Sequence, residues 1–265
     1  MNTALTIGSQ EPGLLTRFGR TLASLPVSYT AAAPDSVPQV MLISGEGEWA
    51  RRGADAIERG CAAVIIVDPG MTSAEQIVEL ADLAERNGSI VECVERYAGD
   101  STLLQHRRDL TQHLVAVSAI ILTQIGDFQN PASAALDMVR TLRALGQTVA
   151  IDKLWTTAHS VGIRGTSGTT LIEGLATAGT VAVGQRIQAL GFGRTLSMTL
   201  HGDGSARPSD IRIANMKGER KWPGVYQSAD RAAWRRIVAS MAVSTSPDVS
   251  GLRLFADDVT KIGRL

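Results

Sequence analysis

Strand-length apolar runs alternate with segments of helical period through the first hundred residues of the chain. The run Val64–Val67 is β-branched and uninterrupted, as expected of a central parallel strand that is covered on both faces. The helical segments each present one apolar face, which is the pattern of helices packed against a sheet. The alternation therefore predicts a parallel, doubly wound α/β sheet. Its strands are expected at 4–8, 27–31, 39–44, 62–67 and 89–94, and its helices at 14–25, 49–59 and 72–87.

Local signals mark both ends of the helix that follows the central strand. Thr72 is the expected N-cap, because its hydroxyl can accept from the backbone N–H of Glu75 while the Glu75 carboxylate reaches back. Asn87-Gly88 supplies a left-handed stop at the other end. Only a short loop is available between the second and third strands, so this connection is predicted to lack a helix.

The pattern changes after about Ser101, where strand candidates follow one another with fewer helices between them. This predicts an α+β domain built on a mostly antiparallel, open sheet. We expect two domains, 1–100 and 101–265. The second should contain helices at 103–114, 131–145, 230–241 and 253–265, strands at 115–122, 148–153, 168–175, 180–183 and 194–201, and loop-rich parts at 162–168 and 202–218.

Composition limits the functions that the chain can have. With 265 residues, 44% of them hydrophobic, it can bury a sizeable core. Lys and Arg number 26, and so do Asp and Glu, which excludes the electrostatic footprint of a general nucleic-acid binder. Cys61 and Cys93 lack metal-ligand spacing, so no metal site is expected. The N-terminus has no leader pattern and no apolar run approaches roughly 18 residues, so we expect a cytoplasmic protein with no membrane partner.

Several motifs in a fixed order carry a resemblance to a known family. The central strand runs into Asp68-Pro69, a capped helix, an Asn-Gly stop and a strand that leads to Tyr97. Upstream lie the strand 39–44 and a helix that ends in Glu-Arg-Gly, and downstream lies the segment 198–205 with its glycine turn. Over about three quarters of the chain this order resembles the NAD(P)-dependent glucose-fructose oxidoreductase / inositol dehydrogenase (Gfo/Idh/MocA) family, whose first domain is Rossmann-like.

The resemblance implies catalytic groups that this chain lacks. In the family the central strand ends in Glu-Lys-Pro and the lysine lies beside nicotinamide and substrate, whereas Asp68 occupies that slot here. The long helix of the family's second domain begins with an Asp and, four residues on, a His that moves the hydroxyl proton. Alignment on Asp137 places Asn130 and Ala134 in those slots. A neutral amide and a methyl group cannot act as a general base.

Nucleotide binding in this architecture depends on a G-x-G-x-x-G turn between the first strand and helix. The corresponding slots are Gly8, Gln10 and Gly13, and Ser44 at the end of the third strand is a further candidate for cofactor contact. Gln10 would fill space that the phosphates need, and Glu11 adds like charge. The second strand also lacks, at its end, the acidic residue that binds the adenosine ribose. The alternative interpretation of the glycines is an ordinary tight turn.

Other side chains are candidates to replace the missing groups. Lys153 and His159 follow a second-domain strand, and a loop at that place can face the cleft; the alternative is a surface lysine and a loop histidine. Trp155 beside Lys153, and Trp222 beside Lys221, are candidates for stacking on a sugar or on a partner. Core packing is the commoner use of such aromatic residues.

These features favour a catalytically degenerate member of the resembled family, retained as a non-catalytic or accessory subunit that needs no cofactor. The resemblance implies that its second-domain sheet pairs with itself or with a full-length, active relative, and that its cleft holds a sugar, cyclitol or related polyol. The alternative is an active NAD(P)-dependent dehydrogenase or reductase that acts on such a substrate through a rearranged site with Asp68, Lys153 or His159.

Overall fold

The computed structural model describes residues 4–9, 11–25, 28–33, 35–128, 130–180, 183–202, 206–243 and 247–264. The chain forms two compact units. The first extends to Glu95 and includes Asp230–Thr260, and the second comprises Arg96–Ala229 and the segment from Lys261. We expected the boundary at residue 100, and the two units divide between Glu95 and Arg96. Residues 230–260, however, pack with the first unit and not with the second, where we expected them.

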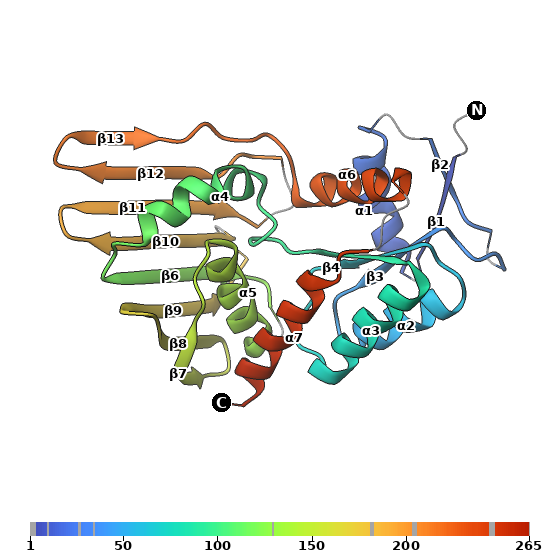
Figure 1. The fold of residues 1–265 in the computed structure, drawn as a ribbon, viewed down its shortest axis with the longest axis horizontal. Coiled ribbons are helices and arrows are strands. Elements are labelled where there is room, and N and C mark those ends of the chain that lie inside the picture. Colours follow the sequence, from blue (N-terminus) through green and yellow to red (C-terminus); the bar gives the residue numbers. More distant parts are fainter. Residues whose placement is uncertain are drawn as a thin grey trace. The chain divides into compact units, whose positions relative to one another are not determined.

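The first unit is a parallel sheet with helices on both faces, which confirms the predicted Rossmann-like, doubly wound architecture (Figure 1). Its elements are β1 (Leu5–Ser9), α1 (Pro12–Leu22), β2 (Tyr29–Ala31), β3 (Val40–Ser44), α2 (Trp49–Glu58), β4 (Ala63–Val67), α3 (Ala74–Asn87), β5 (Ile90–Val94), α6 (Ala229–Ala242) and most of α7 (Ser250–Gly263). The strand order is β2-β1-β3-β4-β5, and all five positions of the central strand β4 are buried.

Aromatic pairs fix the two late helices on this sheet. Phe18 of α1 meets Trp234 of α6 edge to face, with ring centroids 6.2 Å apart. Trp49 of α2 meets Phe255 of α7 in the same way at 5.6 Å. Both Trp rings are fully buried, so these contacts belong to the core of the first unit. They are the physical reason why segment 230–260 belongs to the first unit.

The connection between β2 and β3 contains no helix in its described parts, 32–33 and 35–39, as its length predicted. Thr6 and Gln39 hold it to β1: the Gln39 side chain accepts from the N–H of Thr6 at 3.0 Å, and the Thr6 hydroxyl accepts from the N–H of Gln39 at 2.9 Å. Pro38 packs on Gly8, where an added Cβ would lie 2.8 Å from the proline ring. Gly8 therefore permits close packing of this connection on β1.

The predicted capping of α3 is wrong by one residue. Ser73, not Thr72, is the N-cap, and its hydroxyl oxygen accepts from the N–H of Gln76 at 3.3 Å. The backbone is still extended at Ser73, so the helix begins one position later than expected and the third helical residue is Gln76. The predicted stop is confirmed: Gly88 has a φ of 66° in the left-handed region.

The second unit is built on one mixed sheet, which confirms the predicted α+β part with a mostly antiparallel, open sheet (Figure 1). Its elements are α4 (Ser101–Leu114), β6 (Ala119–Gly126), α5 (Pro131–Ala144), β7 (Ala150–Thr156), β8 (Ser160–Ser167), β9 (Thr170–Ala178), β10 (Gly184–Gly191), β11 (Arg194–His201), β12 (Asp210–Asn215) and β13 (Gly218–Lys221). The strand order is β13-β12-β11-β10-β6-β9-β8-β7, and only β6 and β9 pair in parallel among these neighbours.

The strand prediction is wrong in several parts of this sheet. β8 and β12 lie where the sequence indicated loops, and β6 starts at Ala119 because the chain after α4 first turns. The strand expected at 180–183 falls in part on 181–182, which lie outside the described residues. Because the glycines of β8 have no side chain, β7 can pack closely against β8 at these positions. An added Cβ on Gly162 would lie 2.1 Å from the Trp155 ring, and one on Gly165 would lie 2.1 Å from the carbonyl oxygen of Ala150.

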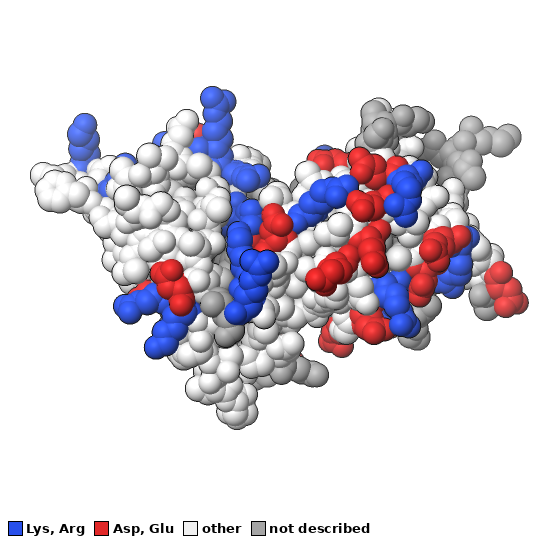
Figure 2. All heavy atoms as spheres, turned by 60° about the horizontal axis from the view of Figure 1, so that its bottom comes forward, with Lys and Arg blue, Asp and Glu red and all other residues white. Residues whose placement is uncertain are grey.

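The neutral total charge conceals an opposite charge on the two units. The first unit has ten Lys and Arg against seventeen Asp and Glu, and the second has sixteen against nine, so their formal charges are −7 and +7. Figure 2 shows acidic side chains gathered over the first unit and mainly basic ones over the second. The charge argument from the whole chain therefore does not hold for each unit separately.

Gly174 of β9 gives a direct test of how α5 packs on the sheet. An added Cβ there would lie 2.7 Å from Ile163 and 2.9 Å from the sulfur of Met138, so Gly174→Ala should lower the free energy of unfolding by about 1–3 kcal/mol. Gly251→Ala on α7 is the control, because its Cβ would meet nothing within 4 Å. Chemical denaturation measures both. Equal stability of the two variants would contradict the described packing.

Candidate functional site

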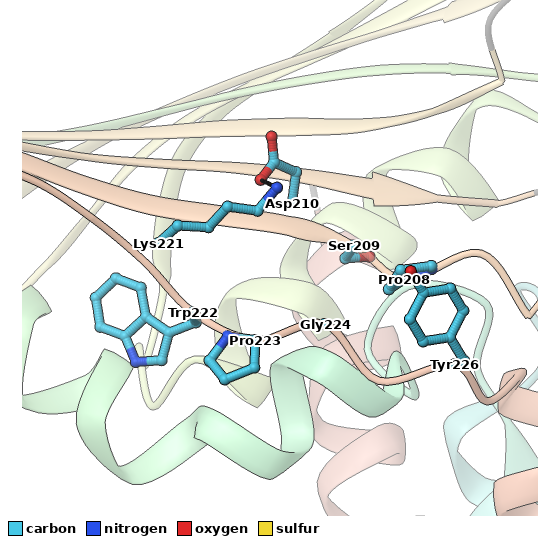
Figure 3. A pocket seen from close by; sticks show the side chains of 8 residues that line it. All are labelled: Pro208, Ser209, Asp210, Lys221, Trp222, Pro223, Gly224 and Tyr226. Carbon is cyan, nitrogen blue, oxygen red and sulfur yellow. Dashed lines mark ion pairs between the residues drawn. The ribbon is translucent and has the colours of Figure 1, made fainter.

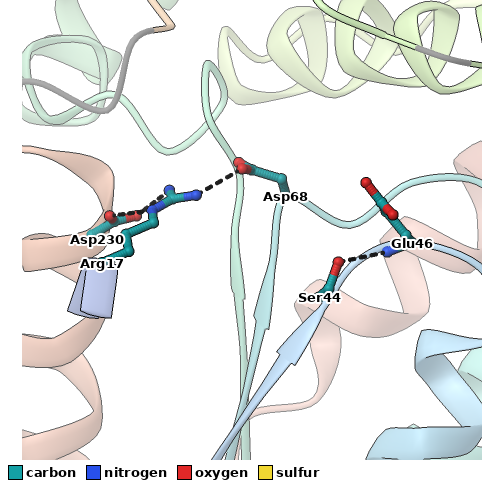
Figure 4. Close-up of polar contacts among 5 residues, drawn as sticks. All are labelled: Arg17, Ser44, Glu46, Asp68 and Asp230. Atoms are coloured by element: carbon teal, nitrogen blue, oxygen red, sulfur yellow. Dashed lines mark hydrogen bonds and ion pairs between the residues drawn. The ribbon is translucent and has the colours of Figure 1, made fainter. Parts of the chain in front are cut away.

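Open α/β sheets bind ligands outside the carboxyl ends of their strands, where the strand order reverses. In the first unit this point lies between β1 and β3. The resemblance predicts pyrophosphate at the N-terminus of α1 and nicotinamide near the end of β4. The side chains at the ends of β1, β3 and β4 therefore form the first candidate site, and Figure 4 shows Ser44 at the end of β3 and Asp68 directly after β4.

Arg17 of α1 joins two carboxylates at this edge (Figure 4). Its Nη1 lies 3.0 Å from Oδ2 of Asp68, directly after β4. Its Nε and Nη2 donate to Oδ2 and Oδ1 of Asp230, at the start of α6, at 2.8 and 2.7 Å. Burial lowers the pKa of Arg17, but the hydrogen bond to Asp230 and the charges of both carboxylates outweigh it and keep the pKa above its ordinary value. The guanidinium therefore stays charged and holds α1, β4 and α6 together.

The backbone at Asp68 is held in an unusual conformation. Asp68 alone among the described non-glycine residues has a positive φ, of 51°, which costs on the order of 1 kcal/mol. Its N–H donates to Val94 at 3.0 Å. The backbone of Gly45 forms two hydrogen bonds: its N–H donates to the carbonyl oxygen of Val67 at 2.6 Å, and its carbonyl oxygen accepts from the N–H of Gly70 at 2.8 Å. An added Cβ on Gly45 would lie 2.3 Å from the Asp68 carbonyl oxygen, so the loops after β3 and β4 pack backbone to backbone.

A second arginine lies across the ends of β1 and β3. Arg52 of α2 donates from Nη1 to Glu11 at 3.0 Å, and from Nη2 to the carbonyl oxygens of Ser44 and Glu46 at 2.7 and 2.6 Å. Glu11 is the N-cap of α1, but its side chain makes no capping bond to the helix. The cavity beside Glu11 and Arg52 has a volume of about 10 Å³, which suffices for roughly one water molecule.

Gly8 and Ser44, two of the expected cofactor residues, take part in contacts within the first unit. Gly8 faces Pro38, and the Ser44 carbonyl accepts from Arg52. Gly13 is exposed, and a Cβ on it would meet nothing within 4 Å, so it is not the third fingerprint glycine that lets a helix approach its strand closely. Gln10 lies outside the described residues.

The two catalytic slots of the second unit lie at the start of α5. Asn130 is the N-cap of this helix and accepts from the N–H of Ala132 at 2.9 Å. Ala134 is fully buried. The Asn130 side chain is therefore sufficient to cap α5, since an N-cap needs only a short side chain with a hydrogen-bond acceptor. Neither residue offers a group that exchanges a proton near neutral pH.

Two buried glutamines that the sequence analysis missed extend this region. Gln124 of β6 donates to Oδ2 of Asp137 at 3.3 Å and accepts from Gln185 of β10 at 2.7 Å. Both glutamines are buried, and the side-chain oxygen of Gln185 has no hydrogen-bond partner. The one sequence signal for Gln124 is the alternation of β6, where it shares the buried face with Ile120 and Leu122.

The candidate replacements Lys153 and His159 do not join these slots. Lys153 is exposed on β7 opposite Arg164, whereas its neighbour Leu154 pairs with Ile163, which faces α5. Since side chains alternate along a strand, Lys153 lies on the sheet face opposite α5. His159 is exposed in the turn between β7 and β8, where its N–H donates to Thr157 at 3.3 Å.

Arg17, Asp230 and Arg52 are also missed by the sequence analysis. Arg17 and Asp230 are separated by 213 positions, and Arg52 and Glu11 by 41. No local spacing connects such residues, and each arginine is an ordinary charge on the polar side of a helix when the sequence is considered alone.

The second unit also contains a pocket of about 440 Å³ at the open end of the β12–β13 hairpin (Figure 3). Trp222, expected as a stacking platform, is 1% exposed. It packs edge to face against His113 at 5.5 Å, with the Arg220 guanidinium 4.9 Å from its ring centre. The exposed aromatic ring at this pocket is that of Tyr226.

No group of three or more His, Cys, Asp or Glu side chains is placed to hold a metal ion in the described part of the chain. Cys61 and Cys93 are free thiols, and burial raises the pKa of Cys61. None of the helices that the structure describes is long and apolar enough to cross a membrane.

No protein-family model and no curated protein matches this chain. Solved structures do. A 3-ketoreductase from Actinomadura kijaniata, solved in complex with NADP, has a TM-score of 0.73 at 10% identity, over 98% of this chain and 95% of that one. A UDP-N-acetylglucosamine 3-dehydrogenase from Acidithiobacillus ferrooxidans has a TM-score of 0.71 at 13% identity, over 98% and 97%. A dehydrogenase from Clostridium difficile has a TM-score of 0.70 at 10% identity, over 99% and 97%.

These similarities confirm the Gfo/Idh/MocA-type fold that the motifs predicted. The alignments span nearly the whole of each neighbour, so both units take part in the likeness. At 10–13% identity they establish the fold alone. The function therefore has to be inferred from the residues of the candidate site.

Removing Arg17 should destabilise the first unit. Arg17→Gln leaves the buried Asp230 carboxylate without its bidentate partner, and we expect the free energy of unfolding to fall by about 2–3 kcal/mol, less than for a fully buried pair because Arg17 is partly exposed. Arg164→Gln breaks the exposed pair with Glu173 and should cost less than about 1 kcal/mol. Urea denaturation compares the two. A loss for Arg17→Gln no larger than that of the control would show that the cluster adds no net stability.

Proposed function

We propose that this chain is a non-catalytic member of the Gfo/Idh/MocA family, retained as an accessory subunit that associates with itself or with an active relative and holds a sugar or polyol without oxidising it. The observation that carries the proposal is the pair of arginine–carboxylate clusters at the carboxyl edge of the first sheet. They occupy the edge where a dinucleotide would need free N–H groups and unfilled space.

The charge at the helix N-terminus argues against pyrophosphate. Glu11 places a carboxylate at the N-cap of α1, where the helix dipole would otherwise attract the phosphates. Arg52 is already engaged by Glu11 and by two backbone carbonyl groups. A dinucleotide would have to displace these contacts and accept the Glu11 charge beside it.

The groups that hydride transfer needs are also missing from the slots where the family has them. Oxidation of a sugar hydroxyl needs a base for its proton and a cation near the developing oxyanion. Asp68, in the lysine slot, is paired with Arg17 and adds a negative side chain. Asn130 caps a helix and Ala134 is buried, so the family's acid–base pair has no counterpart in its own slots.

The alternative function is an active NAD(P)-dependent reductase or dehydrogenase for a sugar, cyclitol or related carbonyl or hydroxyl substrate. Its support is that a 3-ketoreductase solved with NADP shares the fold over nearly its whole length. Reduction needs less help from a base than alcohol oxidation does, and Asp68, Lys153 or His159 would have to supply the proton. The position of Lys153 on the open sheet face does not favour this route.

Titration with NADH and NADPH separates the two functions. Each reduced cofactor is added to the folded protein, and its fluorescence is followed. We expect no saturable change up to about 1 mM cofactor, and a dissociation constant of about 1 mM corresponds to a binding free energy of about −4.1 kcal/mol. Glu11→Gln is the matched variant: it keeps the side-chain size and removes the like charge. Binding by this variant alone would identify the carboxylate as the barrier. Micromolar binding by the unchanged protein would overturn the proposal.

The open face of the second sheet supports the subunit part of the proposal. Six large apolar side chains are exposed on it: Ile121, Ile125, Trp155, Leu171, Leu175 and Leu190. Register places Leu171 and Leu190 on either side of Ala119 in one row. Contiguous exposed apolar patches on soluble proteins commonly mark interaction sites. A second copy of the chain, or a relative with the same sheet, fits this face.

Leu175→Lys tests this surface. Leu175 is 45% exposed, so a lysine there can be solvated without disturbing the core, whereas a charge inside an apolar interface is costly. We expect the variant to be monomeric in sedimentation analysis under conditions where the parent chain forms dimers or larger species. Val243→Lys, on the other unit, is the control and should leave association unchanged. A parent chain that is monomeric at all concentrations, alone and with an active relative, would contradict the subunit proposal.

A further inference from the structure

The three most exposed of the large apolar side chains described in the second unit lie at one end of its sheet. Phe192 and Met216 are fully exposed, at 104% and 96%, and Val115 is 80% exposed. Phe192 lies in the turn between β10 and β11, Met216 in the turn between β12 and β13, and Val115 between α4 and β6. We call these three residues the tip cluster. Such exposure of large apolar groups is the mark of a surface that another surface covers.

Strand register places the two turns next to each other. Arg194 begins β11 and Asn215 ends β12, and these two residues are paired across the strands (Figure 1). Neighbouring strands are about 4.8 Å apart, so roughly 10 Å separates the centres of the two turns. Val115 belongs to the same end, because an added Cβ on Gly191 would lie 2.7 Å from the carbonyl oxygen of Ala116. The tip cluster is therefore one local feature.

The two turns have defined conformations. The side-chain oxygen of Asn215 accepts from the N–H of Lys217 at 2.8 Å, which fixes the turn that carries Met216. Gly193 has a φ of 68°, and this left-handed conformation lets two residues alone connect β10 to β11 beside Phe192. The apolar side chains are therefore presented before any partner arrives, which lowers the entropic cost of docking.

Basic residues accompany the tip cluster. Arg194 follows the first turn, and Lys217 is exposed next to Met216. The carboxylate of Glu219 on β13 is neutralised by Arg212 at 3.2 Å. This end of the sheet is therefore positive, within a unit whose formal charge is +7. A negatively charged surface complements it.

The arrangement of the side chains favours a lipid surface over another protein. Protein interfaces have a contiguous, well-packed apolar core, which the open face of the sheet can supply. In the tip cluster each apolar side chain instead stands on its own turn or connection, with polar and basic residues between them. The headgroup region of a bilayer is fluid and accepts separate apolar side chains to a depth of about 5–10 Å. Long basic side chains can lie along it with their charges at the headgroups.

We propose that the tip cluster docks the second unit reversibly on an anionic lipid surface, with its apolar side chains among the headgroups and Arg194 and Lys217 against the negative charges. Such a contact needs no membrane-spanning segment. The expectation of no membrane partner came from the lack of long apolar runs, which bears on spanning segments alone. The inference goes beyond the proposed function, because it depends neither on NAD(P) binding nor on the open face of the sheet.

Flotation of the full chain with phospholipid vesicles tests the inference. We expect binding at millimolar lipid when about one-third of the phosphatidylcholine is replaced by phosphatidylserine, and much weaker binding to phosphatidylcholine alone. Phe192→Ser should weaken the binding about tenfold, because it removes the partial burial of one aromatic side chain. Lys217→Gln should weaken it about fivefold, the contribution of one basic residue near an anionic surface.

Tyr226→Ser is the matched control. Tyr226 is 78% exposed in the same unit, but it lines the pocket with Asp210 and Lys221 at the other end of the β12–β13 hairpin. We therefore expect this variant to bind vesicles as the parent chain does. Thermal unfolding verifies that each variant is folded, which the full exposure of Phe192 favours.

Failure of the parent chain to bind anionic vesicles at millimolar lipid would overturn the inference. Equal binding to the two kinds of vesicle would overturn it as well, and so would an unchanged affinity in Phe192→Ser. Loss of self-association in Phe192→Ser, for a chain that does not bind vesicles, would assign the tip cluster to a protein contact instead. The cofactor titration is read separately, so neither result decides the other.

Discussion

The Arg17 guanidinium, shared between Asp68 and Asp230, is the interaction on which the candidate site depends. It connects the first helix, the end of the central strand and a helix from the last part of the chain. The same contact that holds α6 on the first sheet also fills the end of β4 with a closed ion cluster. The contact that stabilises the unit is therefore also the one on which the proposed lack of cofactor binding rests.

Arg52 repeats the arrangement at the neighbouring strands. It bonds to Glu11 and to the carbonyl groups after β3, so the ends of β1 and β3 are closed by protein groups. Both arginines satisfy acceptors that phosphates could not satisfy, since phosphates are themselves acceptors. The charge of the first unit acts in the same direction. Its formal charge is −7, so it repels a polyanionic dinucleotide.

The sequence predicts those features of the fold that local patterns encode. The apolar run of β4, the Asn-Gly stop of α3 and the whole of β11 are recognisable because period, capping and turn residues act over a few positions. The sequence predicts a loop at β8 because of its glycines. The reason for these glycines is their contact with Trp155 and Ala150 on the neighbouring strand, which the local pattern does not contain. The sequence predicts Asp68 in the first unit, and Asn130 and Ala134 in the second, as departures from a motif. It does not predict the pairing of Arg17 with Asp230, because this pairing spans 213 positions.

The proposed function requires the carboxyl edge of the first sheet to be a structural ion cluster and not a nucleotide site. Hydrogen–deuterium exchange across the β1–α1 and β4–α3 connections, with and without millimolar NADPH, tests it most directly. We expect slow exchange at the backbone amides of Gly45 and Asp68, which already donate hydrogen bonds, and no change on addition of NADPH. New protection at the start of α1 in the presence of NADPH would contradict it.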